Sequence, residues 1–339
     1  MSRLLRPALL LPLLALAALA AAPFLGFGDR FALTLLARAM ILGMAAVSLS
    51  LLVGGAGLAS LGHAAMMGIG AYVVAALDLA GITEGAIAFP AAILAAACFA
   101  GITGLVALRT SGVYFIMITL AFGQMLFFTL SALSALGGDD GYTLYGRNTL
   151  FGADLLAPRL NFHFLCLGLL AASWGLCALL SRSRFGRVLR AARETPLRVE
   201  ALGFSPYPYR LLAYVIAGGI AGLAGALLAN AMEFVSPALA SWPRSAELLF
   251  MVVLGGVAQL PGALVGALAF VLLEEGLAHV MTAWKLVFGP LLVLAVIFLP
   301  GGLTGGIAGG LPGGRSGRLA GWLPWRRRPK SPGERRADA

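Results

Sequence analysis

Long uncharged stretches alternate with short polar stretches along this chain. Most uncharged stretches have close to 20 residues, enough for a helix to cross the roughly 30 Å hydrocarbon core of a bilayer. The pattern predicts an all-α, polytopic transmembrane helical bundle with about ten membrane segments. The eighth segment is short, so the eighth and ninth could instead form a re-entrant pair of half-helices. The expected segments are 8–27, 31–53, 58–80, 86–108, 112–136, 160–181, 211–232, 245–258, 262–280 and 285–300.

The first apolar run has two possible interpretations. It follows Arg3 and Arg6 and ends in small residues, which is also the pattern of a secretory signal peptide. Because the run extends to Phe27 and many more apolar runs follow it, we expect a retained first helix that enters the membrane from the cytoplasm.

Basic residues predict the orientation of the bundle, because lysine and arginine are retained on the cytoplasmic side. The loop at about 182–210 holds seven arginines between two apolar runs. With both termini inside, the cytoplasm receives two basic residues before the first segment, Arg109, those seven, and eight in the tail. Five of the 24 lie outside, and Arg38 falls within the second segment. We therefore expect a multi-pass protein with cytoplasmic N- and C-termini.

The chain divides into two regions by composition. Residues 1–307 form the expected membrane domain. Residues 308–339 are rich in glycine, proline and arginine without apolar periodicity, which is typical of a disordered segment. The arginine run at 326–328 could lie against anionic lipid headgroups or remain solvated without a role.

Composition excludes several classes of protein. With 60% hydrophobic and 11% charged residues, the chain does not resemble a soluble domain. The net charge of +10 sits in loops and a tail, so we expect no nucleic-acid partner. Three cysteines, Cys98, Cys166 and Cys177, lie in apolar runs without metal or redox spacing, and we expect small core residues.

The sequence holds no catalytic constellation. His63, His163 and His279 are far apart, and there is no GxxxxGK[ST] nucleotide-binding sequence. Glycine runs such as 55–57 and 68–70 lie in or beside apolar segments and lack a strand–helix context. We therefore expect a non-enzymatic protein without metal or cofactor.

Glycines four residues apart predict close helix contacts. In hydrocarbon the hydrophobic effect cannot drive helices together, so small residues that allow close backbone approach do so instead. The default role is packing within the bundle; lining of a conduit or contact with a second subunit is the alternative. The residues are Gly218, Gly222 and Gly225 in one segment, and Gly262 and Gly266 in another.

Four polar residues within apolar runs are candidates for the translocation path: Ser60, His63, Thr119 and Gln124. Polar groups inside a membrane are costly to desolvate and usually face the protein interior. Each could be a hydrogen-bonded core residue or part of a lining that a polar solute contacts.

The basic loop contains two expected helices. Residues 185–193 have helical periodicity, with apolar and arginine positions on different faces. Thr195 and Pro196 then resemble the cap and first turn of a short helix that ends at Gly203. A short helix held between two spans suits a mechanical coupling element, whereas a solvated loop is the alternative.

A weak internal similarity links Gly54–Gly62 with Gly255–Gly262. Transporters often contain internal repeats with broken helices near the substrate site. Glycine-rich membrane segments also match each other by chance, so both interpretations stay open.

The sequence resembles the branched-chain amino-acid ABC importer permeases of the LivM type. Five stretches carry the resemblance in the same order along the chain: Gly54–Tyr72, Gly112–Met125, Gly137–Gly141, Phe185–Leu227 and Leu248–Ala267.

The resemblance implies an importer permease in the bacterial inner membrane that passes leucine, isoleucine, valine or a similar small polar solute. Its implied partners are a second, LivH-like permease, two cytoplasmic ATPases, a periplasmic solute-binding protein and membrane lipid. The ATPase-coupling element would include Arg193, Glu194, Glu200, Ala201 and Gly203.

Two alternatives remain for the substrate and the energy source. The Gly137–Gly141 stretch departs from the family pattern, which leaves urea, short amides or aromatic acids open as substrates. An ion-coupled secondary transporter is the alternative from another class, and it would need membrane-embedded acids for the coupling ion. The only charge that we expect within a predicted span is Arg38, with acids near the span boundaries, which argues against this class.

Overall fold

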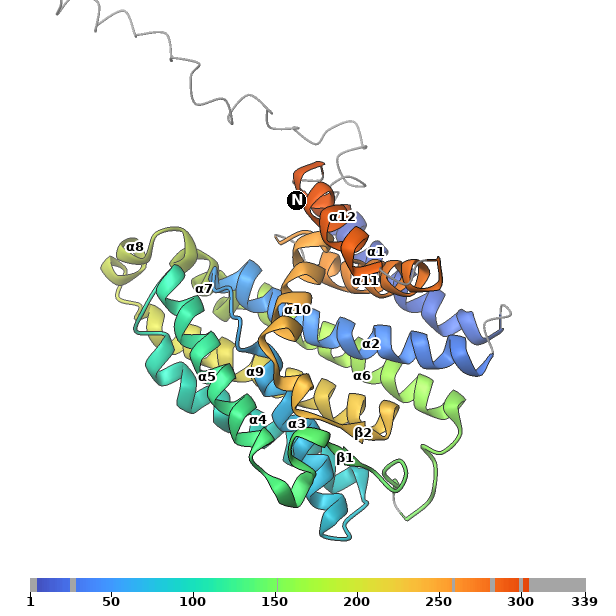
Figure 1. The fold of residues 1–339 in the computed structure, drawn as a ribbon. Coiled ribbons are helices and arrows are strands. Elements are labelled where there is room, and N and C mark those ends of the chain that lie inside the picture. The colour runs from blue at the N-terminus through green and yellow to red at the C-terminus, as the bar shows by residue number, and fades with distance from the viewer. Residues whose placement is uncertain are drawn as a thin grey trace, which may run out of the picture.

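The computed structural model describes residues 5–24, 29–150, 152–257, 260–280, 284–298 and 301–304. Arg3 and the expected tail at 308–339 lie outside these residues. The described chain is almost entirely helical (Figure 1). Its helices are α1 (Leu5–Ala21), α2 (Arg30–Ser50), α3 (His63–Leu79), α4 (Gly85–Ala107), α5 (Val113–Ser131), α6 (Arg159–Arg182), α7 (Arg184–Glu194), α8 (Pro196–Ala201), α9 (Pro206–Met232), α10 (Trp242–Gly255), α11 (Leu260–Val280) and α12 (Trp284–Phe298); two short strands are β1 (Tyr142–Thr143) and β2 (Phe234–Val235).

Each of the ten expected segments overlaps one helix, from α1 to α6 and from α9 to α12. Six helical stretches among the described residues are long and apolar enough to cross a membrane, and shorter apolar helices accompany them. The bundle is therefore an all-α membrane architecture. The long stretches are Arg30–Ala56, Gly85–Ala107, Val113–Ser131, Arg159–Arg182, Pro206–Met232 and Leu260–Val280.

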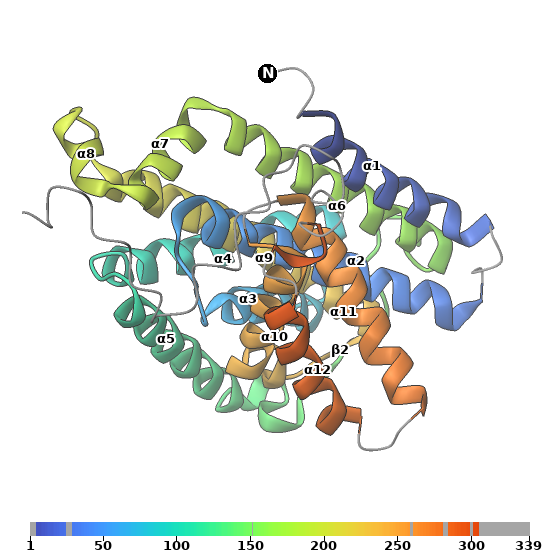
Figure 2. The same cartoon turned by 90° about the horizontal axis from the view of Figure 1, so that it is seen from above.

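Two helices form the centre of the bundle. The apolar stretches of α2 and α9 are 83% and 78% buried, whereas those of α4, α5 and α6 are 28% buried or less. Figure 2 shows α2 and α9 in the middle with the other helices around them. α4 and α3 pack on α9, and α6 and α11 pack on α2. The outer helices therefore keep one broad face free for lipid or another subunit.

Helix α2 does not end where the sequence pattern predicts. It continues into a π-helical turn, Leu51–Ala56, which we call the π-turn. Gly57 then adopts a positive φ of 72°, a conformation that costs glycine little. The next residues are not helical, and α3 starts only at His63. The expected helix at 58–80 is therefore wrong in its first five residues, because 58–60 have no regular structure and 61–62 form a turn. We call residues 58–62 the 58–62 segment.

A second non-helical segment folds back into the bundle after α9. Strand β2 leads to a 3₁₀ turn at Pro237–Ala240, and α10 follows it. A Cβ atom added at Gly68, in α3, would lie 2.6 Å from the Ala240 side chain. The 3₁₀ turn that precedes α10 therefore packs on α3. Helix α10 spans Trp242–Gly255 instead of the expected 245–258.

Contacts between loops define two ends of the bundle. At one end, which we call the strand end, Tyr142 of β1 pairs with Val235 of β2, and the Gly85 backbone N–H donates to the Thr149 carbonyl over 2.7 Å. At the other, the loop end, α7 packs on the π-turn, and α8 packs on α7. The seven arginines of the basic loop lie at the end of α6, in α7 and α8, and in the first turns of α9.

Three smaller expectations are wrong. Cys98 is exposed on α4, although Cys166 and Cys177 are buried as expected. Thr195 precedes α8 but makes no side-chain capping hydrogen bond. Arg38 is not the only charge inside a span, because Glu274 lies within α11 and pairs with it over 3.1 Å.

Candidate functional site

The N-termini of α3 and α10 meet inside the bundle, and we call this contact the central junction. The first backbone N–H groups of a helix lack partners within the helix, and no water supplies them in hydrocarbon. Here the Ala64 N–H donates to the Ser245 hydroxyl over 3.0 Å. Ser48 of α2 lies 2.8 Å from Nε2 of His63. Serine hydroxyls therefore supply the polar partners that these broken helices need.

Three of the four path candidates lie together beside this junction. The Leu61 N–H donates to the Thr119 hydroxyl over 3.3 Å, which connects the 58–62 segment to α5. The Gly62 N–H donates to the Ser60 hydroxyl over 3.3 Å, one residue before His63. Sequence spacing alone could not place Thr119 with Ser60 and His63, because they are nearly 60 residues apart.

The fourth candidate, Gln124, lies on a partly exposed flank of α5. Its side chain makes no hydrogen bond within the described part of the chain. Ser60, His63 and Thr119 are no more than 1% exposed, so the junction is closed. The arrangement offers uncharged hydrogen-bonding groups and no ionised side chain.

The predicted packing glycines lie where helices approach most closely. Gly222 faces Ala92 and Ala96 of α4, and a Cβ atom at Gly218 would lie 2.6 Å from the Ala100 side chain. Gly225 faces the backbone of Met67 in α3. Gly262 and Gly266 face Gly255 at the end of α10. All five glycines thus face another helix of the same chain.

Helix α7 lies along the loop end and contacts the π-turn. Ser183 caps it by accepting a hydrogen bond from the Gly186 N–H over 3.4 Å. Its inner face buries Gly186, Leu189 and Ala192. One Nη of Arg193 donates to the Gly54 carbonyl over 2.6 Å, and the Arg193 stem lies against Gly57. Leu189 and Arg193 are four residues apart, so both extend from one face of α7 to the π-turn.

Helix α8 projects from the loop end and exposes most of its surface. Pro196 occupies its first turn, and Gly203 follows it with a φ of 84°. Glu194, Glu200 and Ala201 are exposed, and neither glutamate forms an ion pair within the described chain. Leu197 and Leu202 are 79% and 71% exposed. The exposure of these two leucines outside the membrane spans is a feature that the sequence analysis missed.

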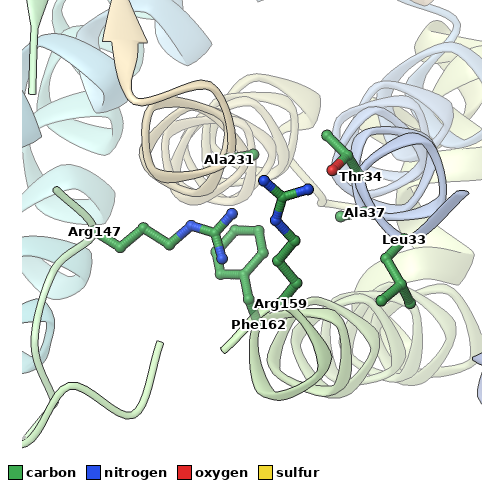
Figure 3. A pocket seen from close by; sticks show the side chains of 7 residues that line it. All are labelled: Leu33, Thr34, Ala37, Arg147, Arg159, Phe162 and Ala231. Carbon is green, nitrogen blue, oxygen red and sulfur yellow. The ribbon is translucent and has the colours of Figure 1, made fainter. Parts of the chain in front are cut away.

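The strand end holds a small cavity between α2, α6 and α9. Figure 3 shows the side chains of Arg147 and Arg159 extending toward it. Arg147 lies 4.7 Å above the Phe162 ring and 3.4 Å from a Glu233 carboxylate oxygen. Burial lowers the pKa of the Arg147 guanidinium, and the Glu233 charge opposes that shift. The contact joins the loop before α6 to the end of α9, which stabilises this end of the bundle.

The described residues contain no group of three or more histidine, cysteine, aspartate or glutamate side chains that could hold a metal ion. Three polar features of the described residues are candidates for function: the closed central junction, the α7–α8 surface and the arginine pair at the strand end.

Comparison with known proteins shows which family this chain belongs to. The family described as the permease component of branched-chain amino acid transport systems matches residues 31–311. The chain belongs to this family. The match includes the central junction, α7, α8 and the glycines of α9.

Individual relatives agree with the family. The chain is 30% identical over 287 residues to the high-affinity branched-chain amino acid transport system permease protein LivM of Escherichia coli K12, across 78% of this chain and 67% of that protein. LivM of Salmonella typhimurium LT2 gives the same identity and coverage. A probable LivH permease of Methanocaldococcus jannaschii is 38% identical over 61 residues, or 18% of this chain and 19% of that protein. No solved structure matches.

Proposed function

We propose that this chain is one permease subunit of an ATP-driven importer and carries branched-chain amino acids across the bacterial inner membrane. The observation that carries the proposal is the family match over residues 31–311. The relatives named LivM support leucine, isoleucine and valine as substrates. A second, LivH-like permease, two ATPases and a periplasmic binding protein complete the proposed transporter.

The surface of α8 is the proposed docking site for an ATPase subunit. It presents two exposed leucines, Leu197 and Leu202, beside the unpaired carboxylate of Glu200. Apolar side chains at the centre of a patch with charge at its rim are typical of a protein contact. The acidic side chain of Glu200 would favour a basic partner surface.

Movement of α7 would reach the central junction through the π-turn. Arg193 and Leu189 contact the π-turn directly, and Gly57 and the 58–62 segment lead from it to His63. In the proposed cycle, closure of the ATPases displaces α8 and α7, and the displaced π-turn opens the closed junction. Rocking of this kind, around a site formed by discontinuous helices, is common in transporters.

The loop end is the proposed cytoplasmic side. All seven arginines of the basic loop and Arg109 lie at this end, whereas the strand end carries Arg30, Arg147 and Arg159. This distribution follows the retention of basic residues on the cytoplasmic side. Both termini of the membrane domain at 1–307, and the tail at 308–339, would then be cytoplasmic.

The charges within the spans favour ATP over an ion gradient as the energy source. A coupling ion would need a carboxylate that is free to bind it. Two glutamates lie in the last two turns of α11. The guanidinium of Arg38 pairs with Glu274 over 3.1 Å, whereas Glu275 forms no ion pair among the described residues. The central junction offers hydroxyls and one imidazole rather than carboxylates.

Co-purification tests the proposed assembly. The tagged chain is expressed with its neighbouring genes, as wild type or as a Leu197→Glu, Leu202→Glu double variant. Wild type should recover two ATPase chains and a second permease, and the variant should lose the ATPases alone. Leu155→Glu is the matched control, because Leu155 is 48% exposed at the strand end. A variant that retains the ATPases would exclude α8 as their docking site.

Uptake by the purified complex tests the substrate. With the binding protein present, we expect competition with labelled leucine by isoleucine and valine. Stronger competition by urea, acetamide or benzoate would assign the chain to one of the other substrate classes.

A further inference from the structure

An apolar groove crosses the outer surface of the bundle between α4 and α6, with α9 as its floor. Its volume is about 400 Å³, and Ser173 is its only polar lining residue. The groove exists because α4 packs chiefly on α9 and α3, whereas α6 packs chiefly on α2. Small residues at the rim and the floor keep it open. They are Ala97 of α4, Ala172 of α6 and Gly219 of α9.

The shape of the groove suits an alkyl chain better than a helix. If a methylene takes roughly the 30 Å³ of a liquid water, the groove holds on the order of a dozen methylenes. A helix with its side chains is about 10–12 Å across. It would contact the rims of a groove of this volume without entering it.

Apolar character alone cannot retain one lipid, because the surrounding hydrocarbon is equally apolar. Selection needs a polar attraction at the level of the headgroup. The groove reaches Leu176 of α6, and α6 ends at Arg182, about 9 Å further on at 1.5 Å per residue. The end of α6 therefore lies where the phosphate of a lipid in the groove would be.

Three arginines gather at this end of α6, and we call them the arginine cluster: Arg182, Arg187 and Arg190. Arg187 donates to the Arg182 carbonyl over 3.2 Å, and Arg190 donates to the Ser181 carbonyl over 2.9 Å. All three are exposed. None forms an ion pair with a carboxylate in the described chain. The end of a helix contributes only about half a negative charge, so the cluster remains strongly positive.

We infer that the α4–α6–α9 groove and the arginine cluster together bind one anionic phospholipid of the leaflet at the loop end. One acyl chain occupies the groove and the phosphate lies against the cluster. Filling the groove holds α6 beside α4 and α9. The bound lipid also connects α6 to α7, which carries two of the three arginines.

Native mass spectrometry of the full chain, with any subunits that co-purify, tests this inference. The protein is exposed to phosphatidylglycerol vesicles or to phosphatidylcholine vesicles with the same acyl chains. We expect about one phosphatidylglycerol retained per chain, and little phosphatidylcholine. Equal retention of both lipids would overturn the role of the arginine cluster.

Variants test the two parts separately. Arg187→Gln with Arg190→Gln keeps donors for the α6 carbonyls but removes two charges. At about 1 kcal/mol per arginine near the headgroups, phosphatidylglycerol should bind roughly thirtyfold more weakly. The control Arg198→Glu changes the net charge by the same amount on α8, and it should leave binding unchanged. An equal loss in the control would show nonspecific attraction.

Ser173→Phe fills the groove from α6, and Ala97→Leu fills it from α4 should the first variant fail to fold. Either should abolish retention, whereas Ile102→Phe should not, because Ile102 is exposed on α4 and does not line the groove. Retention by both filled variants would overturn the proposed place of the acyl chain. A Ser173→Cys variant that cross-links to the second permease would also overturn the inference, because the groove would then be a subunit contact.

Discussion

The contact between Arg193 and the π-turn gives a direct test of how α7 is connected to the central junction. Arg193→Ala removes the 2.6 Å hydrogen bond to the Gly54 carbonyl and the stem that lies against Gly57. A hydrogen bond that involves a charged group is worth about 1.5–3 kcal/mol. Arg193 is exposed, and solvent weakens exposed charge interactions, so we expect about 1 kcal/mol.

Amide hydrogen exchange of residues 51–62 measures this effect. Local opening of a segment sets its exchange rate, and 1.4 kcal/mol corresponds to a factor of ten. Arg193→Ala should therefore raise the amide exchange rate in the π-turn and the 58–62 segment by roughly five- to tenfold. Exchange in α4 should not change, because the variant removes no contact with that helix.

Arg190→Ala is the matched control for this experiment. Arg190 also donates from α7 to a backbone carbonyl, over 2.9 Å, but the acceptor is Ser181 of α6. The control should leave the π-turn protected. Equal exchange in wild type and Arg193→Ala would refute the account, since α7 would then not hold the π-turn.

Three further predictions concern stability. Gly222→Leu places side-chain atoms against Ala92 and Ala96 and should lower thermal stability in detergent by at least the 1–3 kcal/mol typical of overpacking; Gly168→Leu, with open space around it, should not. Arg38→Leu leaves Glu274 unpaired and should destabilise the protein more than Arg38→Leu with Glu274→Leu, because unpaired buried charge is the main cost; an equally unstable double variant would contradict this. Partial burial and the Asp78 carboxylate raise the pKa of Tyr142, so its stabilising effect should be lost as the pH rises above about 10. Tyr142→Phe should remove that part of the pH dependence in thermal melts.

Local signals predicted the elements of the basic loop well. Arginine and apolar positions at helical spacing predicted α7. Pro196 and Gly203 predicted the limits of α8. These signals depend on neighbouring residues, so they can be read from sequence. The prediction of Thr195 as the cap of α8 was wrong, because its side chain makes no capping hydrogen bond. The cap of α7 by Ser183 was not predicted.

Features that depend on distant segments could not be predicted in this way. The residues at 58–62 are as apolar as a span, so hydropathy could not distinguish their non-helical conformation from a helix. Thr119 lies beside the 58–62 segment because of how α5 packs. Ser245 lies beside Ala64 because of how α10 packs. The pairing of Arg38 with Glu274 joins residues 236 positions apart.

The groove and the exposed surface of α8 show the same limit. A sequence cannot distinguish an exposed leucine from a buried one. Only the tertiary structure shows that Leu197 and Leu202 are exposed. The α4–α6–α9 groove arises from a gap between two packing arrangements. No single segment of the sequence encodes it.

The central claim is that ATP drives this permease. Its most direct test is leucine uptake by proteoliposomes that hold the complete complex and its binding protein, with ionophores present to abolish ion gradients. The account predicts uptake that requires ATP inside the vesicles and is lost in the Leu197→Glu, Leu202→Glu variant. Uptake that needs an ion gradient and proceeds without ATP would contradict it.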